Sequence, residues 1–220
     1  MDDLPLAEGI EAKRVAIKQA WARAGRRLTG TADPGHAQRL PPGQRLVTNW
    51  PVLDLGIQPD VPCADWRLTV DGAVANPVEW NWDALMAQPA FDDVSDIHCV
   101  TQWSRYDNRW TGVSTQHLLA VVQPLPSAAH VILHGYDGYT TNVRLDHFAE
   151  GDCLLAHSHD GVPISREHGG PVRAILPRWY LWKSAKWLER IEFRDGDRPG
   201  FWEVRGYHDE GDPWVEQRYR

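Results

Sequence analysis

The residues best placed to do chemistry gather first around Cys99. The apolar, alternating residues 94–98 predict a β-strand that ends in this cysteine, and a polar, aromatic loop is expected over 100–112 at the edge of the core. A cysteine in such a place can ligate a metal ion as thiolate, because the ion itself displaces the thiol proton. The alternative interpretation is that Cys99 is a small, buried hydrophobic residue.

A second group of donors lies within residues 168–186. Two adjacent glycines allow the backbone to approach another group closely. Three cations and a hydroxyl accompany them, a combination that suits a phosphate or an electron-rich heterocycle. The alternative is a solvated loop whose cations stack on the neighbouring aromatic rings. The side chains concerned are Arg173, Lys183, Ser184 and Lys186.

The histidines and cysteines offer a third kind of site, a zinc centre. His157 and His159 can share one face of a strand, but no acidic residue at helical spacing completes the pattern of a zinc hydrolase. The three cysteines are widely spaced and form no CxxC pair, which argues against a zinc knuckle, covalently attached haem and a disulfide framework. A zinc hydrolase is therefore kept only as an alternative.

Short β-strands are expected to position these residues. Asp-Gly turns at 71–72 and 137–138 interrupt alternating apolar residues, which predicts paired strands. The expected strands are 68–70, 77–80, 94–98, 131–133, 139–145, 154–155, 172–176 and 188–193.

The expected helices are few and short. Because they interrupt the strands without a strict alternation, the sequence predicts the α+β class, with mainly mixed β structure in a single domain. The candidate N-caps are Asn81 before 82–88, Ser114 or Thr115 before a helix ending at Val122, and Asp146 before another helix.

The first 39 residues differ from the rest of the chain. Residues 8–28 form a basic, loosely amphipathic pattern that predicts a helix ending before Gly30, and 29–43 has the composition of a linker. We therefore expect an N-terminal helix and linker over 1–39 and one domain over 40–220. The helix is interpreted as a solvated element, with a membrane-surface or partner-binding helix as the alternative.

Composition excludes several classes of function. The 220 residues are 42% hydrophobic and 24% charged, and no apolar run is long enough to span a membrane. A formal net charge of −7 makes nucleic acid an unsuitable main partner. The acidic start lacks a basic region followed by an apolar one, so we expect the protein to be cytoplasmic.

Four separated motifs stand in an order typical of one family. They are Cys99-Val100 with Trp103-Ser104, Trp110 and Gly112; Gly169-Gly170-Pro171-Val172-Arg173; Lys183-Ser184-Ala185-Lys186; and 198–202 with 211–214. From about residue 40 to 220 the chain resembles the molybdopterin-binding domain of the sulfite oxidase family, in particular its small cytosolic members. The first and third motifs are also similar to the catalytic subunit of bacterial protein-methionine-sulfoxide reductase.

This resemblance implies one molybdenum ion, held by the dithiolene of a single pyranopterin and by one protein thiolate, which by motif position is Cys99. The metal then cycles by two electrons while one oxygen atom passes between it and the substrate. The residues implied to hold the pterin and its phosphate are His168, Arg173, Ser184, Ala185, Lys186, Gly135 and, in the N-terminal loop, Asn49.

The chain departs from the family beside the metal ligand. Vertebrate and plant sulfite oxidases carry a Gly-Asn-Arg-Arg run there, whereas this chain has Val-Thr-Gln-Trp-Ser before Arg105. A neutral oxide, or an oxyanion paired with Arg105, fits the family's chemistry. With one guanidinium in place of a basic run, we expect reduction of a small sulfoxide or N-oxide rather than sulfite oxidation, with Arg105 polarising the bond to oxygen. The expected substrate pocket is edged by Trp103, Arg105, Tyr139 and Thr140.

The electron partner is not encoded in the chain itself. No haem, flavin or iron–sulfur motif is present, so we expect electrons to pass to or from a separate, unidentified protein. A competing interpretation is a metal-free β module whose many aromatic residues bind carbohydrate or peptide. One molybdenum per chain separates the first interpretation from this one.

Overall fold

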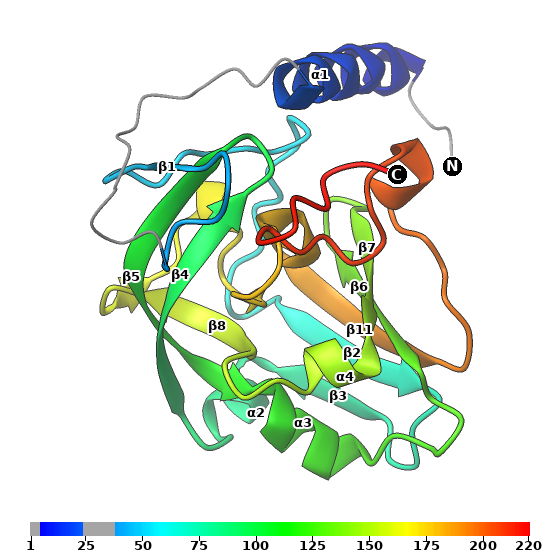
Figure 1. Cartoon of the computed structure of the whole chain (residues 1–220). Helices are drawn as coiled ribbons and strands as arrows, with labels where there is room; N and C mark the ends of the chain where they lie inside the picture. Colours follow the sequence, from blue (N-terminus) through cyan, green and yellow to red (C-terminus); the bar gives the residue numbers. More distant parts are fainter. Residues whose placement is uncertain (1–4, 24–37) are drawn as a thin grey trace.

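The computed structural model describes residues 5–23 and 38–220, and two mixed β-sheets form the framework of this part (Figure 1). The first sheet has the order β1-β5-β8-β10, with β4 beside β5 and β9 beside β8. The β1 and β5 strands are parallel, whereas the other pairs of this sheet are antiparallel. The strands are β1 (Arg45–Leu46), β4 (Phe91–Cys99), β5 (Trp103–Ser114), β8 (Leu154–His159), β9 (Val162–Pro163) and β10 (Arg173–Ile175).

The second sheet has the order β3-β2-β11-β6-β7. Its central pair, β2 and β11, is parallel, although these strands lie far apart in the sequence, and the remaining pairs are antiparallel. These parallel and antiparallel pairs, with few helices, confirm the predicted α+β class with mainly mixed β structure. The strands are β2 (Arg67–Gly72), β3 (Val78–Asn81), β6 (His130–Gly135), β7 (Thr140–Arg144) and β11 (Leu188–Arg194).

Short helices begin where the sequence places capping side chains. Asn81 accepts a hydrogen bond from the Ala84 N–H and caps α2 (Trp82–Met86). Ser114 accepts from the His117 N–H and caps α3 (Thr115–Val122). The third helix, α4 (Leu145–Phe148), starts one residue earlier than predicted, and Asp146 lies in its first turn. Single 3-10 turns are η2 (Arg166–His168), η3 (Leu181–Lys183) and η4 (Glu203–Arg205).

The predicted loop after Cys99 is wrong. Three residues, 100–102, form a tight turn in which Gln102 has a positive φ of 71°, and the chain then returns as the strand β5. Trp103 and Trp110 are each 1% exposed, so the aromatic residues that resembled a loop are strand residues packed into the core. Charged residues stand between these two tryptophans on β5, so the sequence does not show the alternation of apolar and polar residues that predicts a strand.

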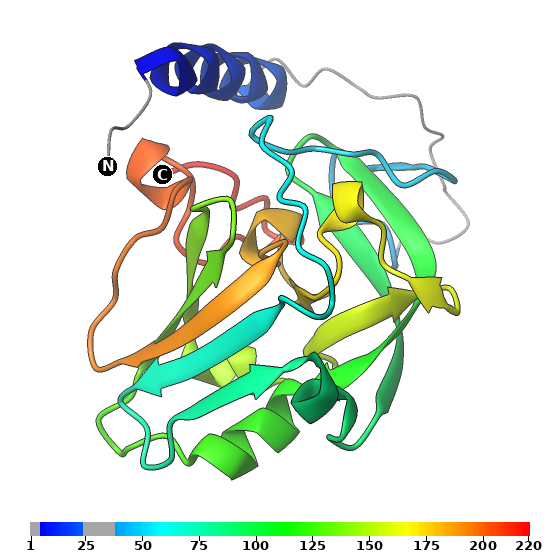
Figure 2. The same cartoon turned by 180° about the vertical axis from the view of Figure 1, so that it is seen from behind.

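The remaining helix, α1 (Pro5–Arg23), lies outside both sheets (Figure 2). It was predicted over 8–28, but it starts earlier, and residues 24–37 with most of the predicted linker fall outside the described part of the chain. Both views place α1 over the end of the molecule where the 47–57 loop and the C-terminal segment meet. Within residues 5–23 and 38–220, no helix has both the length and the hydrophobicity required to cross a membrane.

Candidate active site

A cavity opens beneath α1, whose Lys18 is among its lining residues. Six of the predicted site residues line it. They come from the β4–β5 turn, the β6–β7 turn, β10 and the segment after η3, elements that are distant in sequence. The six are Cys99, Trp103, Tyr139, Arg173, Ser184 and Lys186.

Cys99 is the last residue of β4 and is 6% exposed. The tight turn that follows brings the Thr101 hydroxyl to 3.1 Å from its Sγ, and Gln44 fixes the turn by donating to the Cys99 carbonyl at 3.1 Å. Burial raises the pKa of the thiol, while the charges of Lys18 and Arg218 act in the opposite direction. A bound cation is therefore what would convert this sulfur into a thiolate.

Trp103 and Tyr139 both line the cavity, but their polar groups differ in hydrogen bonding. The Tyr139 hydroxyl already donates to the Trp182 carbonyl at 2.5 Å, so it fixes the fold of the segment around η3. Trp103 Nε1, by contrast, is buried and has no acceptor among the described residues, although its side chain lines the cavity. A buried N–H without an acceptor costs free energy, so this donor is suited to a bound ligand.

Arg173 and Lys186 are the cations of the cavity's inner wall. Arg173 is 2% exposed and donates only to backbone carbonyls, those of His168 at 2.7 Å and Ser184 at 2.9 Å among them. Burial lowers the pKa of Arg173 to about 9, and burial together with the charge of Arg173 lowers the pKa of Lys186 to about 7. Among the described residues, no carboxylate forms an ion pair with either.

Carboxylates nevertheless line the same cavity. Asp54 and Asp137 contribute to it, and their charges raise the pKa of Lys186 against the effect of burial. Burial raises the pKa of Asp137 itself to about 6. Three cations, Lys18, Arg173 and Lys186, thus line the cavity with two carboxylates, so the lining side chains carry a small net positive charge.

Ser184 and Ala185 act mainly as supports. The Ser184 hydroxyl accepts from the Leu176 N–H at 2.9 Å, and the Ala185 carbonyl accepts from the Ala174 N–H at 2.9 Å. The nearby glycines also serve the protein rather than a ligand, since a Cβ on Gly170 would lie 2.0 Å from the Ile164 carbonyl oxygen. The sequence predicts that these glycines let another group approach their backbone closely, and in the structure that group is a backbone carbonyl of the protein itself.

Three other predicted cofactor residues do not line the cavity. His168 stacks on Trp50, with ring centroids 4.0 Å apart, and its Nε2 lies 3.1 Å from the Trp50 carbonyl oxygen. Gly135 lies behind Lys186, because a Cβ there would be 2.6 Å from the Lys186 carbonyl oxygen. Asn49 is exposed. The structure thus places His168 and Gly135 behind lining residues and Asn49 at the surface beside Trp50.

Arg105 is also absent from the lining. It lies on β5, where it donates to His159 at 2.9 Å and to the Asp160 carboxylate at 2.9 Å, and it contacts Asn108. Thr140, expected at the pocket edge, is likewise not a lining residue. Because residues 103–114 form the strand β5 and not a loop, the Arg105 side chain faces the neighbouring β8 segment and not the surroundings of Cys99.

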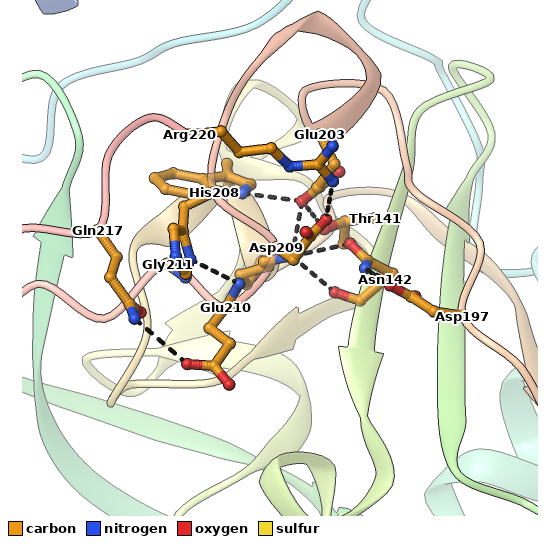
Figure 3. A network of polar contacts seen from close by, with 12 residues as sticks. Thr141, Asn142, Asp197, Glu203, His208, Asp209, Glu210, Gly211, Gln217 and Arg220 are labelled. Atoms are coloured by element: carbon orange, nitrogen blue, oxygen red, sulfur yellow. Dashed lines mark hydrogen bonds and ion pairs between the residues drawn. The ribbon is translucent and has the colours of Figure 1, made fainter.

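Lys183 belongs to a separate buried network. Its ammonium donates to Glu203 at 2.7 Å and to the Asn142 side chain at 2.9 Å, and Glu203 also accepts from Thr141 at 3.0 Å and from Trp182 Nε1 at 2.9 Å. Figure 3 shows these dashed contacts converging between β7 and the C-terminal segment. The network fixes the wall that carries Trp182 and excludes Lys183 from the cavity, contrary to its predicted role as a phosphate donor.

Several lining residues escaped the sequence analysis. The aromatic ones had a signal, because their number was unusual, but nothing distinguished those of the cavity from those of the core. Lys18 had none, since its helix looked solvated. The missed residues are Lys18, Trp50, Asp54, Asp137, Trp182, Trp187, Trp202 and Tyr207.

The histidines do not gather into a metal centre. His134 contacts Glu192 in the second sheet, whereas His159 and His168 both pack on Trp50, with ring centroids 4.6 Å and 4.0 Å from it. Within the described ranges, no group of three or more His, Cys, Asp or Glu side chains is arranged to hold an ion. A metal at Cys99 would therefore need most of its ligands from a larger bound group.

Comparison with known proteins bears directly on that group. The family model described as oxidoreductase molybdopterin binding domain matches residues 55–202. An uncharacterized oxidoreductase, YuiH, of Bacillus subtilis is 43% identical over 193 residues, which cover 86% of this chain and 96% of the relative. The protein-methionine-sulfoxide reductase catalytic subunit MsrP of Burkholderia mallei is 30% identical over 62% of this chain, but this match spans only 46% of MsrP.

A solved structure supports the fold alone. The sulfane dehydrogenase SoxCD from Paracoccus pantotrophus superposes with a TM-score of 0.58 at 20% identity, over 63% of this chain and 40% of that one.

Proposed function

This chain belongs to the oxidoreductase molybdopterin-binding domain family and is an enzyme, and from that premise we propose that it transfers one oxygen atom to or from a small sulfur or nitrogen compound. The proposed cofactor is molybdenum on a single pyranopterin. When bound, it supplies the two-electron chemistry of the oxygen transfer. The direction we propose is reduction of a neutral sulfoxide or N-oxide.

The residues of the cavity fit such a group. Cys99 offers one buried sulfur, a soft ligand suited to a heavy metal, and the other ligands can come from the dithiolene. Among the described residues, the buried Arg173 and the half-buried Lys186 form no ion pair with a carboxylate, and both suit the pterin phosphate, since a charge held away from water requires compensation. Ser184, Ala185, His168, Gly135 and Asn49 are proposed to hold or support this cofactor wall.

The charge balance of the cavity is the observation that carries the substrate proposal. The three lining cations exceed the two carboxylates by at most one charge, and by about half a charge near pH 7, where Lys186 is half protonated, whereas a phosphate brings about two negative charges at neutral pH. The loaded cavity would then repel sulfite, a dianion that also loses much hydration on entry. A neutral oxide avoids both penalties.

The remaining walls favour the same substrate. Trp103 Nε1 is a buried donor without an acceptor, and we propose that it donates to the oxygen of the substrate. Tyr139, Trp182 and Trp202 form an apolar side that excludes water from that hydrogen bond. Arg105 enters the proposal only through the hairpin that it braces.

The partners are part of the same proposal. MsrP is named as a catalytic subunit, so a protein of this kind works with others, and we propose a separate electron-transfer protein for this chain as well. A cytoplasmic location remains a prediction from the sequence.

Metal analysis of protein from a host that makes molybdopterin tests the proposed cofactor, and we expect roughly one molybdenum per chain. One zinc per chain would support the zinc hydrolase, and the absence of metal would support the binding module.

The decisive test compares substrates. We expect kcat/KM for dimethyl sulfoxide, methionine sulfoxide or trimethylamine N-oxide with an artificial donor to exceed kcat/KM for sulfite with an artificial acceptor. Cys99→Ser should abolish both reactions in a folded protein, because a hydroxyl is a harder and less acidic ligand, while Cys63→Ser and Cys153→Ser keep activity. Sulfite turnover of ~10⁴ M⁻¹s⁻¹ or more, with every oxide orders of magnitude slower, would contradict the proposal.

A further inference from the structure

The helix α1 lies outside the part of the chain that matches the family model, yet it contributes to the cavity. Val15 is 8% exposed and packs into the core, and Gln19 donates to the Arg205 carbonyl at 3.1 Å. Lys18 lines the cavity, and its ammonium donates to the backbone carbonyl of Asp54. The inner side of α1 therefore covers the cavity and is attached on both sides of its mouth.

The orientation of Lys18 is unusual for a surface helix. Long cationic side chains normally extend their charge into water, as the exposed Lys13 does on the same helix. Lys18 is instead turned inward, and burial lowers its pKa while the Asp54 carboxylate opposes this effect. An inward ammonium costs solvation, and such a cost is offset when an anion lies opposite.

The lining of the cavity locates this ammonium within the site. Lys18, Cys99 and Lys186 line the same cavity, and the Lys18 ammonium is held there by its hydrogen bond to the Asp54 carbonyl. Lys18 thus shares the cavity with the sulfur that suits a metal and with the cation that suits a phosphate. A ligand that reaches from one to the other passes close to it.

We propose that Lys18 is a cofactor-binding residue and that α1 closes over the phosphate-bearing pyranopterin once it has entered. This inference rests on the proposed function and adds a third cation to Arg173 and Lys186. It also assigns the N-terminal helix, which the sequence pattern describes only as a solvated element, a place in the site. The exposed side of α1, with Ile17 and Trp21, takes no part.

The test follows the release of pterin, not activity. Lys18→Met keeps the length of the side chain and removes its charge, and Lys13→Met is the matched control on the exposed side of α1. After loading in a host that makes molybdopterin, each full-length protein is dialysed, and the pterin that remains is oxidised and measured by fluorescence. We expect Lys18→Met to lose pterin about tenfold faster than wild type, Lys13→Met to match wild type, and Lys18→Arg to restore retention.

The outcomes separate the two proposals. Equal retention by Lys18→Met and wild type would overturn the role of Lys18 and leave the proposed function intact. Wild-type protein that binds no pterin at all would overturn both. Loss of pterin together with a lower melting temperature of the cofactor-free Lys18→Met protein would assign Lys18 a structural role and overturn this inference.

Discussion

Lys183 and Lys186 are three residues apart in one segment, and the protein treats their charges in opposite ways. Lys183 is buried against Glu203, its own counter-ion at 2.7 Å, inside a network closed by Asn142. Lys186 faces the cavity and donates to the Glu167 carbonyl, without a carboxylate in ion-pair contact among the described residues. In sequence both looked like phosphate donors.

The comparison separates cations that hold the fold from cations that await a ligand. A buried cation with a protein counter-ion is satisfied before any ligand arrives. A buried or half-buried cation without a counter-ion, as Arg173 and Lys186 are, costs free energy in the cofactor-free protein, and the ligand that supplies the anion recovers that cost. Arg173 belongs with Lys186 in this respect, whereas Arg105, paired with Asp160 at 2.9 Å, belongs with Lys183.

The largest expected effect is on folding and comes from Lys183→Met. This change leaves Glu203, which is 1% exposed, buried without its cation, and loss of one partner of a buried pair typically costs ~3–5 kcal/mol. Urea unfolding of the cofactor-free protein measures it. The control is Lys186→Met, which should leave the free energy of unfolding unchanged or slightly higher. Equal destabilisation by both variants would remove the distinction between the two lysines.

The next effect is on cofactor content. Arg173→Ala and Lys186→Ala should each weaken retention by ~1.5–3 kcal/mol, because each removes a charge-assisted donor to a phosphate. Pterin per folded chain is the measurement, with a chemical-unfolding curve for each variant as control. Full occupancy in the double variant after extensive dialysis would mean that these two cations do not hold the phosphate.

How far the sequence leads can be judged on the same residues. Motif order selects Cys99, Arg173 and Lys186, and the structure brings all three to the lining of one cavity. The direction of a side chain cannot be predicted from its type and neighbours. Lys183 differs from Lys186 because it pairs with Glu203, which is distant in the sequence. Helix caps such as Asn81 are local and were predicted correctly, but the turn after Cys99 was not, because its partner strand decides it.

A third effect is a pH dependence of anion binding. In the empty protein the pKa of Lys186 is lowered to about 7, so this lysine is protonated below pH 7 and neutral above it. A bound dianion raises this pKa towards the ordinary value of 10.5, so binding takes up one proton above pH 7. Affinity should therefore be level just below pH 7 and fall by up to about tenfold per pH unit above it.

Sulfate is the suitable probe for this experiment, because it stays a dianion over the whole range. The rise in melting temperature with sulfate, followed from pH 7 to 8.5, reports the affinity. Most of this window lies between the ionisation of Asp137, whose pKa is about 6, and that of Arg173, whose pKa is about 9, so the slope is read from pH 7 to 8. Lys186→Met should abolish the slope, and a slope that persists in this variant would assign the proton to another group.

The smallest expected effect is that of Arg105→Gln. Its guanidinium is engaged by Asp160 and His159 and does not line the cavity, and its partner carboxylate is 42% exposed, so the pair contributes at most about 1 kcal/mol to stability. We expect kcat/KM for a sulfoxide to stay within about twofold of wild type. Trp103→Phe, which keeps a ring but removes the Nε1 donor, should lower it by about tenfold. The reverse order of the two variants, at equal cofactor content, would return the polarising role to Arg105 and make Trp103 a packing residue only.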